Sequence, residues 1–354
     1  MKAETATPLA SKLRALITAE GALPLSRYMD LCLNDPEHGY YATRRPIGAA
    51  GDFTTAPEVS QMFGELVAIW AMAVWDAIGR PDPFALVEIG PGRGTLMVDM
   101  LRTARSQPAF AAALRPHLIE TSPTLREMQR EAVGDATWRE RVADLPPLPI
   151  VIVANELLDA LPFEQYRFDG GWRRQVVAVR DGRFRREDGA PCPLDRTGEE
   201  GDVVEIAPAR EAMMHGVSDL IAERGGAAIW IDYGSLAGGV GDTFQALAGH
   251  ERVDPFARPG EADLTSHVDF AALRRVARDA GCAVQTATQG RFLLAMGLLE
   301  RAGVLGANAD ETGREAIRAA VERLAGPSTM GELFKVMAVR HPDLPPLPGF
   351  GETP

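Results

Sequence analysis

The segment from Leu86 to Leu96 constrains the fold more than any other part of this 354-residue chain. Its sequence, LVEIGPGRGTL, predicts a buried strand that runs through a glycine turn into a helix. Glycine permits a positive φ and lets backbone amides approach a ligand with no Cβ in the way. In a doubly wound sheet such a turn lies at the carboxyl edge, where adenosine-containing cofactors bind. The alternative is a tight turn that binds nothing.

The spacing of the glycines distinguishes an S-adenosylmethionine site from a dinucleotide site. Together with Glu88, they give the pattern E-x-G-x-G-x-G, which is typical of S-adenosylmethionine sites. A dinucleotide-binding turn has glycine at the sixth position, where this chain has Thr95, so a nicotinamide dehydrogenase is the least favoured class. We therefore predict S-adenosylmethionine as the cofactor, with Glu88, Gly90, Gly92 and Gly94 among its binding residues.

Composition and simple sequence patterns argue against several classes of protein, although a local basic patch stays open. The net charge of -12 disfavours a nucleic-acid partner, because such proteins carry clustered Lys and Arg. The 3 cysteines are far apart, so no zinc site is predicted. The apolar stretch from Leu66 to Trp75 is too short to span a bilayer, so no membrane insertion is expected. The N-terminal residues show neither a secretory signal nor a basic amphipathic presequence, which predicts a cytoplasmic location.

The order of the expected elements predicts an α/β fold. Strands and helices alternate from Phe84 onward, which indicates a mostly parallel, doubly wound sheet. A single strong helix is expected to begin near Val59, and a D-G-G turn at 169–171 indicates a hairpin. The expected parts are an N-terminal helical region with a cofactor-covering loop (1–80), a main domain (81–340) and a proline-rich tail without a packing pattern (341–354). The main domain should contain a β-rich insertion (163–205) and a long substrate-side loop (238–268).

Two further residues are predicted on the cofactor side. Glu120 ends the strand after the glycine helix, where a carboxylate can accept hydrogen bonds from both ribose hydroxyls. It lies about 30 residues after Gly90 rather than the usual 20 or so, so the intervening segment must be extended. Trp138 lies at the end of the next expected strand and could cover the adenine ring. The alternative for Glu120 is a solvated acid at the end of a strand, and the alternative for Trp138 is a tryptophan in the core.

Catalytic residues are predicted directly after the apolar strand 149–154. Asn155, Glu156 and Asp159 emerge there, at the edge where an acceptor would meet the methyl group. Because methyl transfer is an in-line displacement, the main task is to align the acceptor. If the acceptor is an arginine, carboxylates can hold its guanidinium. A helix cap is the alternative for Asp159 and a solvated acid for Glu156, while Thr55 either contacts the cofactor or organises a helix start.

Several segments together resemble the MidA family of methyltransferase-like proteins, over roughly residues 9–340. They include NELLDALP at 155–162, GDFTTAPE at 51–58, DPEHGYY at 35–41, Glu120 and the glycine turn. The resemblance implies a class I methyltransferase fold, Rossmann-like, and transfer to arginine in a protein partner, with a link to respiratory complex I assembly. The chain lacks the S-E-x-M-G-x-x-L stretch of ordinary protein arginine methyltransferases, so their paired-glutamate mechanism does not carry over.

Three functions follow from these patterns. The first is an S-adenosylmethionine-dependent enzyme that methylates arginine in a protein, such as a complex I subunit. The second is a complex I assembly factor that binds its partner and keeps a vestigial cofactor site. The third is a small-molecule methyltransferase whose insertions close over a small pocket.

Overall fold

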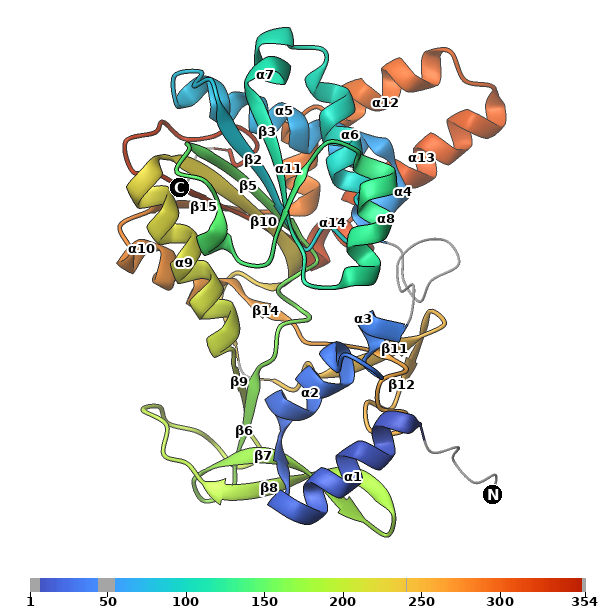
Figure 1. Cartoon of the computed structure of the whole chain (residues 1–354), viewed down its shortest axis with the longest axis vertical. Coiled ribbons are helices and arrows are strands. Elements are labelled where there is room, and N and C mark those ends of the chain that lie inside the picture. The colour runs from blue at the N-terminus through green and yellow to red at the C-terminus, as the bar shows by residue number, and fades with distance from the viewer. Residues whose placement is uncertain (1–6, 44–54, 240, 352–354) are drawn as a thin grey trace. The chain divides into compact units, whose positions relative to one another are not determined.

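The computed structural model describes residues 7–43, 55–239 and 241–351 (Figure 1). The chain forms two compact units, each assembled from separate segments. The first unit comprises Met1–Phe53, Leu158–Ala212 and Gly238–His267, and the second comprises Thr54–Leu157, Met213–Ala237 and Val268–Pro354. The expected boundaries near residues 80 and 340 stay predictions.

The second unit contains the predicted sheet. Its strands follow the order β15-β16-β10-β5-β2-β3-β4, and β14 pairs with β10. All neighbours from β10 to β4 are parallel, while β16 runs antiparallel to both β10 and β15. The mostly parallel, doubly wound sheet is therefore confirmed. The bounds are β2 Phe84–Ile89, β3 Leu114–Ile119, β4 Thr137–Arg139, β5 Ile150–Asn155, β10 Gly226–Ser235, β14 Val268–Asp269, β15 Ala283–Thr288 and β16 Phe334–Arg340.

Helices cover both faces of this sheet, with α5 and α6 on one face and α10 on the other (Figure 1). Apolar side chains of α5, such as Phe63 and Trp70, pack on the strand residues Leu86 and Val153. The helices of the unit are α4 Ala56–Val59, α5 Gln61–Ala77, α6 Thr95–Ala104, α7 Pro108–Ala113, α8 Pro123–Val133, η1 Val142–Asp144, α10 Phe270–Asp279, α11 Gln289–Ala295, α12 Leu298–Ala307, α13 Glu311–Ala325 and α14 Met330–Leu333. Helix α9, Pro208–Arg224, begins in the first unit and ends in the second.

The prediction of one helix from Val59 onward is wrong at its start. Ser60 has extended backbone angles, with φ -165 and ψ 141, and its hydroxyl accepts a hydrogen bond from the backbone N–H of Met62. A serine in this conformation caps a new helix. Val59 therefore ends α4, and α5 begins at Gln61.

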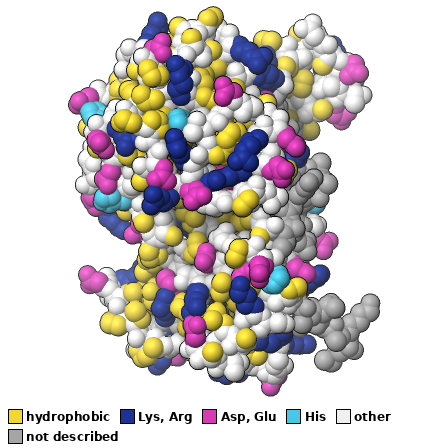
Figure 2. Space-filling model, in the orientation of Figure 1, with side chains coloured by type: hydrophobic (Ala, Val, Ile, Leu, Met, Phe, Trp, Pro, Cys, Tyr) yellow, Lys and Arg dark blue, Asp and Glu magenta, His cyan; other side chains and the backbone are white. Residues whose placement is uncertain are grey.

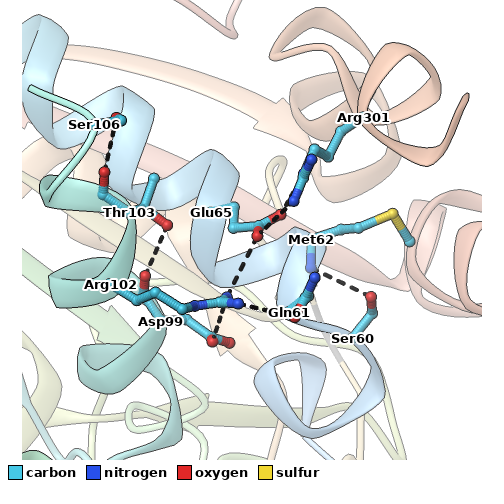
Figure 3. Close-up of polar contacts among 9 residues, drawn as sticks. All are labelled: Ser60, Gln61, Met62, Glu65, Asp99, Arg102, Thr103, Ser106 and Arg301. Carbon is cyan, nitrogen blue, oxygen red and sulfur yellow. Dashed lines mark hydrogen bonds and ion pairs between the residues drawn. The ribbon is translucent and has the colours of Figure 1, made fainter. Parts of the chain in front are cut away.

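A buried carboxylate joins α12 to α5 and α6 (Figure 3). Arg301 donates to Glu65 through Nε at 2.7 Å and Nη2 at 2.9 Å, and Arg102 Nη2 lies 3.3 Å from the same carboxylate. Arg102 also pairs with Asp99 at 2.7 Å. Since Glu65 is only 7% exposed, its charge depends on these guanidinium groups for compensation. The network fixes α12 by charge-assisted hydrogen bonds.

The first unit combines helices with antiparallel strands. Strands β6 and β7 form the hairpin predicted from the D-G-G turn. Their sheet has the order β1-β7-β6-β9, with β8 paired to β7, and its core includes Leu13, Tyr28, Phe163 and Val177. The elements are α1 Pro8–Glu20, β1 Leu23–Pro24, α2 Leu25–Asn34, α3 Tyr40–Thr43, β6 Glu164–Phe168, β7 Trp172–Arg180, β8 Arg183–Pro191 and β9 Val203–Ile206.

Two segments that were expected to be irregular are ordered. The expected loop 238–268 contains β11 Gln245–Ala248, β12 Glu251–Val253 and β13 Asp263–Thr265. Gly249 and His250, both at positive φ (59 and 64), give the two-residue turn that a tight hairpin needs. The described part of the tail is packed, because Leu347 is buried and its backbone N–H donates to Gln285 Oε1 at 2.8 Å.

The surface of the chain carries both signs of charge. On the face drawn in Figure 2, Lys and Arg side chains are interspersed with Asp and Glu. Among the described residues, no helix combines the length and the apolar character needed to cross a bilayer.

Candidate functional site

The glycine turn connects β2 to α6 in the left-handed backbone region. Gly90, Gly92 and Gly94 have φ values of 67, 53 and 85. A Cβ at Gly90 would lie 2.7 Å from Leu157 Cδ1, and one at Gly94 would lie 2.8 Å from Val133 Cγ2. The positive φ and the closeness of the neighbouring side chains therefore both require glycine at positions 90 and 94. We call this turn, residues 90–94, the cradle. It packs closely against Leu157 and Val133, and in a doubly wound sheet a turn at this place is where an adenosine-containing cofactor lies against the backbone.

Glu88 lies on β2, two residues before the turn. The backbone N–H of Met97 donates to its carboxyl group, while Oε2 has no hydrogen-bond partner among the described residues. Burial raises the pKa of Glu88 to about 8. Such an orphaned acceptor next to the cradle is compatible with a cofactor contact, and the binding role of Glu88 stays a prediction.

The Glu88 carboxyl should make stability depend on pH. Between its ordinary pKa of 4.5 and its folded value of about 8, the folded state keeps a proton that the unfolded chain has released. The free energy of unfolding therefore falls as pH rises across this window, by at most about 5 kcal/mol at about 1.4 kcal/mol per pH unit. In urea unfolding, Glu88→Gln should match the original chain at pH 5 and be more stable at pH 8.5. The same pH slope for both chains would contradict this expectation.

Glu120 follows β3 directly and is buried, so it is not the solvated acid of the alternative. The backbone N–H groups of Thr121 and Ser122 both donate to Oε1 at 2.8 Å, and Gln129 donates to Oε2 at 3.1 Å. Burial raises the pKa of Glu120, and these hydrogen bonds oppose the shift. Helix α7 lies between α6 and β3 and accounts for the long spacing from Gly90.

Trp138 is the central residue of β4, which pairs with β3. Its indole Nε1 donates to Gln129 Oε1 at 2.9 Å, and the guanidinium carbon of Arg130 lies 5.4 Å from the ring centroid. The side chain is half-buried and packs beside the core of the second unit. Its contact with adenine stays a prediction.

The carboxyl end of β5 brings two sequence motifs together. Asn155 is the last residue of β5, and its Nδ2 donates to Glu156 Oε1 at 3.1 Å. The backbone N–H of Ala56, from the GDFTTAPE motif, donates to the same oxygen at 3.0 Å. Glu156 has a φ of 50, which is uncommon outside glycine. Asn155 Oδ1 is buried and has no hydrogen-bond partner among the described residues.

Asp159 and Thr55 are the remaining predicted site residues. Asp159 belongs to the first unit and lies in a turn, so it is not the helix cap of the alternative. Its backbone oxygen accepts from Ser266 N and from Arg210 Nη2, each at 3.1 Å. Thr55 holds the N-cap position of α4, but its side chain makes no capping hydrogen bond. Residues 51–54 of the same motif, and 44–50 before it, lie outside the described residues.

Two residues outside the predicted set of site residues, Glu58 and Gln129, organise this site, and for Glu58 the GDFTTAPE motif allowed either a cofactor contact or a role at the helix start. Glu58 Oε1 accepts from the Thr95 hydroxyl at 2.5 Å, which ties the GDFTTAPE motif to the start of α6. Gln129 is fully buried on α8 and bonds to both Glu120 and Trp138. Its position four residues after Leu125, on the apolar face of the helix, was the available signal for a buried polar group.

Comparison with known proteins gives consistent matches. A family model described as "Putative S-adenosyl-L-methionine-dependent methyltransferase" matches residues 66–288. "Protein arginine methyltransferase NDUFAF7 homolog, mitochondrial" from Drosophila melanogaster is 34% identical, covering 97% of this chain and 88% of that protein. "Protein arginine methyltransferase NDUFAF7, mitochondrial" from Danio rerio is 34% identical, covering 94% and 85%. A structure from Burkholderia thailandensis bound to S-adenosyl-homocysteine has a TM-score of 0.84 and 30% identity, covering 97% of this chain and 94% of that one.

These matches confirm the predicted resemblance, the methyltransferase fold and the S-adenosylmethionine cofactor. They also support a protein as the substrate. The prediction of a cytoplasmic location is wrong, because these relatives are named as mitochondrial proteins.

Proposed function

Because the chain belongs to the family of S-adenosylmethionine-dependent methyltransferases, we propose that it methylates an arginine side chain in a protein partner. The names of its relatives, at 34% identity over nearly the whole chain, support arginine as the acceptor. The resemblance to the MidA family supports a respiratory complex I subunit as the partner. The observation that carries the proposal is the orphaned Asn155 Oδ1 at the carboxyl edge of the sheet.

The cofactor half of the proposed site consists of the residues around the glycine turn. Gly90, Gly92 and Gly94 would let the backbone approach the cofactor, and Glu88 would face its ammonium group. Glu120 would accept from the ribose hydroxyls, and Trp138 would cover the adenine. When bound, S-adenosylmethionine supplies a methyl group activated by its positively charged sulfur.

The acceptor half consists of Asn155, the last residue of β5, and Glu156, which follows it. Asn155 Oδ1 would accept an N–H of the arginine guanidinium and orient one nitrogen toward the methyl group. Glu156 would add negative charge beside the guanidinium, since a carboxylate forms strong charge-assisted hydrogen bonds with it. Its orientation is supported by the hydrogen bonds from Asn155 Nδ2 and Ala56 N. The catalytic role of Asp159 stays a prediction that rests on the NELLDALP motif alone.

The proposal is tested by labelling. The protein is incubated with S-adenosylmethionine that carries a tritiated methyl group and with cell extract, and labelled proteins are then hydrolysed to amino acids. We expect label in methylarginine, and we expect it to accumulate far more slowly with Asn155→Ala. Label found in small metabolites alone would overturn arginine methylation. Label in a protein outside complex I would overturn only the proposed partner.

A further inference from the structure

One buried side chain connects three parts of the cofactor half. Gln129 Nε2 donates to the carbonyl oxygen of Gly92 at 2.7 Å and to Glu120 Oε2 at 3.1 Å. Its Oε1 accepts from Trp138 Nε1 at 2.9 Å. The side chain is 0% exposed, so these protein groups replace water as its hydrogen-bond partners.

The chemistry of the partners allows the Gln129 amide only one orientation. A carbonyl and a carboxylate accept hydrogen bonds, whereas an indole N–H only donates. Rotating the amide by 180° would place its oxygen against two acceptors and its NH2 group against a donor. The three contacts therefore fix the side chain completely, and the side chain in turn fixes the spacing between the glycine turn, β3 and β4.

We propose that Gln129 is a positioning residue that holds Gly92, Glu120 and Trp138 ready for the adenosine part of the cofactor. This inference rests on the ribose role proposed for Glu120. A site whose groups are already in place loses less conformational entropy when the ligand binds. Gln129 touches the groups that contact the cofactor and need not touch the cofactor itself.

The Gln129 contact should also control the charge of Glu120. The carboxylate faces the backbone N–H groups of Thr121 and Ser122, the Gln129 amide, and Arg126, which donates to the Glu120 backbone oxygen and lies 3.5 Å from Glu140. The Gln129 N–H favours the ionised carboxylate and so lowers its pKa. Without this donor the pKa rises, and Glu120 becomes protonated at a higher pH.

The test is calorimetric titration with 5′-methylthioadenosine from pH 5 to pH 8. This probe keeps the nucleoside and lacks the amino acid part, so it does not report on Glu88. Gln129→Met keeps the length of the side chain and removes its hydrogen bonds. We expect about tenfold weaker binding at pH 7, and a pH midpoint for binding that rises by about one unit. Gln129→Glu places a second carboxyl beside Glu120 and should raise the midpoint further.

Two controls separate the possible failures. In Glu120→Gln the affinity for the probe should no longer depend on pH. Adding Gln129→Met to this variant should then cause no shift of a pH midpoint. If Glu120→Gln binds the probe as the original chain does, the ribose assignment is wrong. If Glu120→Gln weakens binding while both Gln129 variants keep the original midpoint, the positioning role is wrong. Glu127→Met, at an exposed position of the same helix, should leave binding unchanged. A uniform loss of affinity at every pH would indicate a merely structural role and would overturn the inference.

Discussion

Asn155→Ala is expected to slow methyl transfer about 100-fold while the Kd for S-adenosylhomocysteine changes by less than about twofold. The variant removes Oδ1, the buried acceptor with no partner among the described residues, and also the amide that donates to Glu156 Oε1. The acceptor nitrogen would then lose a hydrogen bond from its charged group and its alignment with the methyl group. Single-turnover rates with the arginine substrate, together with calorimetry, measure the two effects separately.

Asn155→Asp is the matched control for this prediction. It keeps an oxygen acceptor at the same place but replaces the Nδ2 donor to Glu156 with a second negative charge. We expect a rate between those of the original chain and Asn155→Ala. An unchanged rate for Asn155→Ala would contradict the acceptor role, and an equal loss of cofactor affinity would assign Asn155 to the cofactor side instead.

Gly90→Ala is expected to weaken S-adenosylhomocysteine binding at least about 100-fold. Two effects combine at this position. Alanine at a φ of 67 is strained, and its Cβ would lie 2.7 Å from Leu157 Cδ1, so the turn or Leu157 must move. Leu157 directly follows Glu156, and therefore the displacement would also reach the proposed acceptor half. Calorimetry with S-adenosylhomocysteine measures the loss.

The control for Gly90→Ala is Gly170→Ala, in the turn between β6 and β7. Gly170 has a similar φ of 60, but a Cβ there would meet no atom within 4 Å. The backbone strain is therefore comparable, and we expect a loss of stability of about 1 kcal/mol with unchanged binding. Unchanged binding in Gly90→Ala, in a folded protein, would show that the cradle does not hold the cofactor.

Local patterns in the sequence predicted the elements that carry the site. The apolar run before Asn155 specifies a buried strand, and the glycines specify a turn that other residues would strain. Such features depend on neighbours in sequence, so they were recognisable without the fold. The resemblance to a known family added the class of reaction, which the glycine turn alone does not specify.

Contacts between residues far apart in the sequence could not be predicted, because local patterns carry no information about them. The place of Gln129 on the apolar face of α8 indicates that it is buried, but it does not reveal its partners, which belong to the glycine turn, Glu120 and β4. Leu347 lies in a proline-rich segment, and its anchor is the side chain of Gln285 on β15. The helix break at Ser60 depends on a single capping hydroxyl within a strong apolar pattern. In each case the deciding contacts are side-chain hydrogen bonds, three at Gln129, two between Gln285 and Leu347 and one at Ser60.

The antiparallel strand β16 also has a consequence for synthesis of the protein. It covers one edge of β10 along its length, from Ala227 opposite Arg340 to Tyr233 opposite Phe334. Since β10 ends at Ser235, the ribosome must add about 100 residues before β16 is complete. At roughly 5 to 20 residues per second this takes about 5 to 20 s. During that interval the nascent chain presents an apolar strand edge with open hydrogen-bonding groups, which is the kind of surface that promotes aggregation and that chaperones bind.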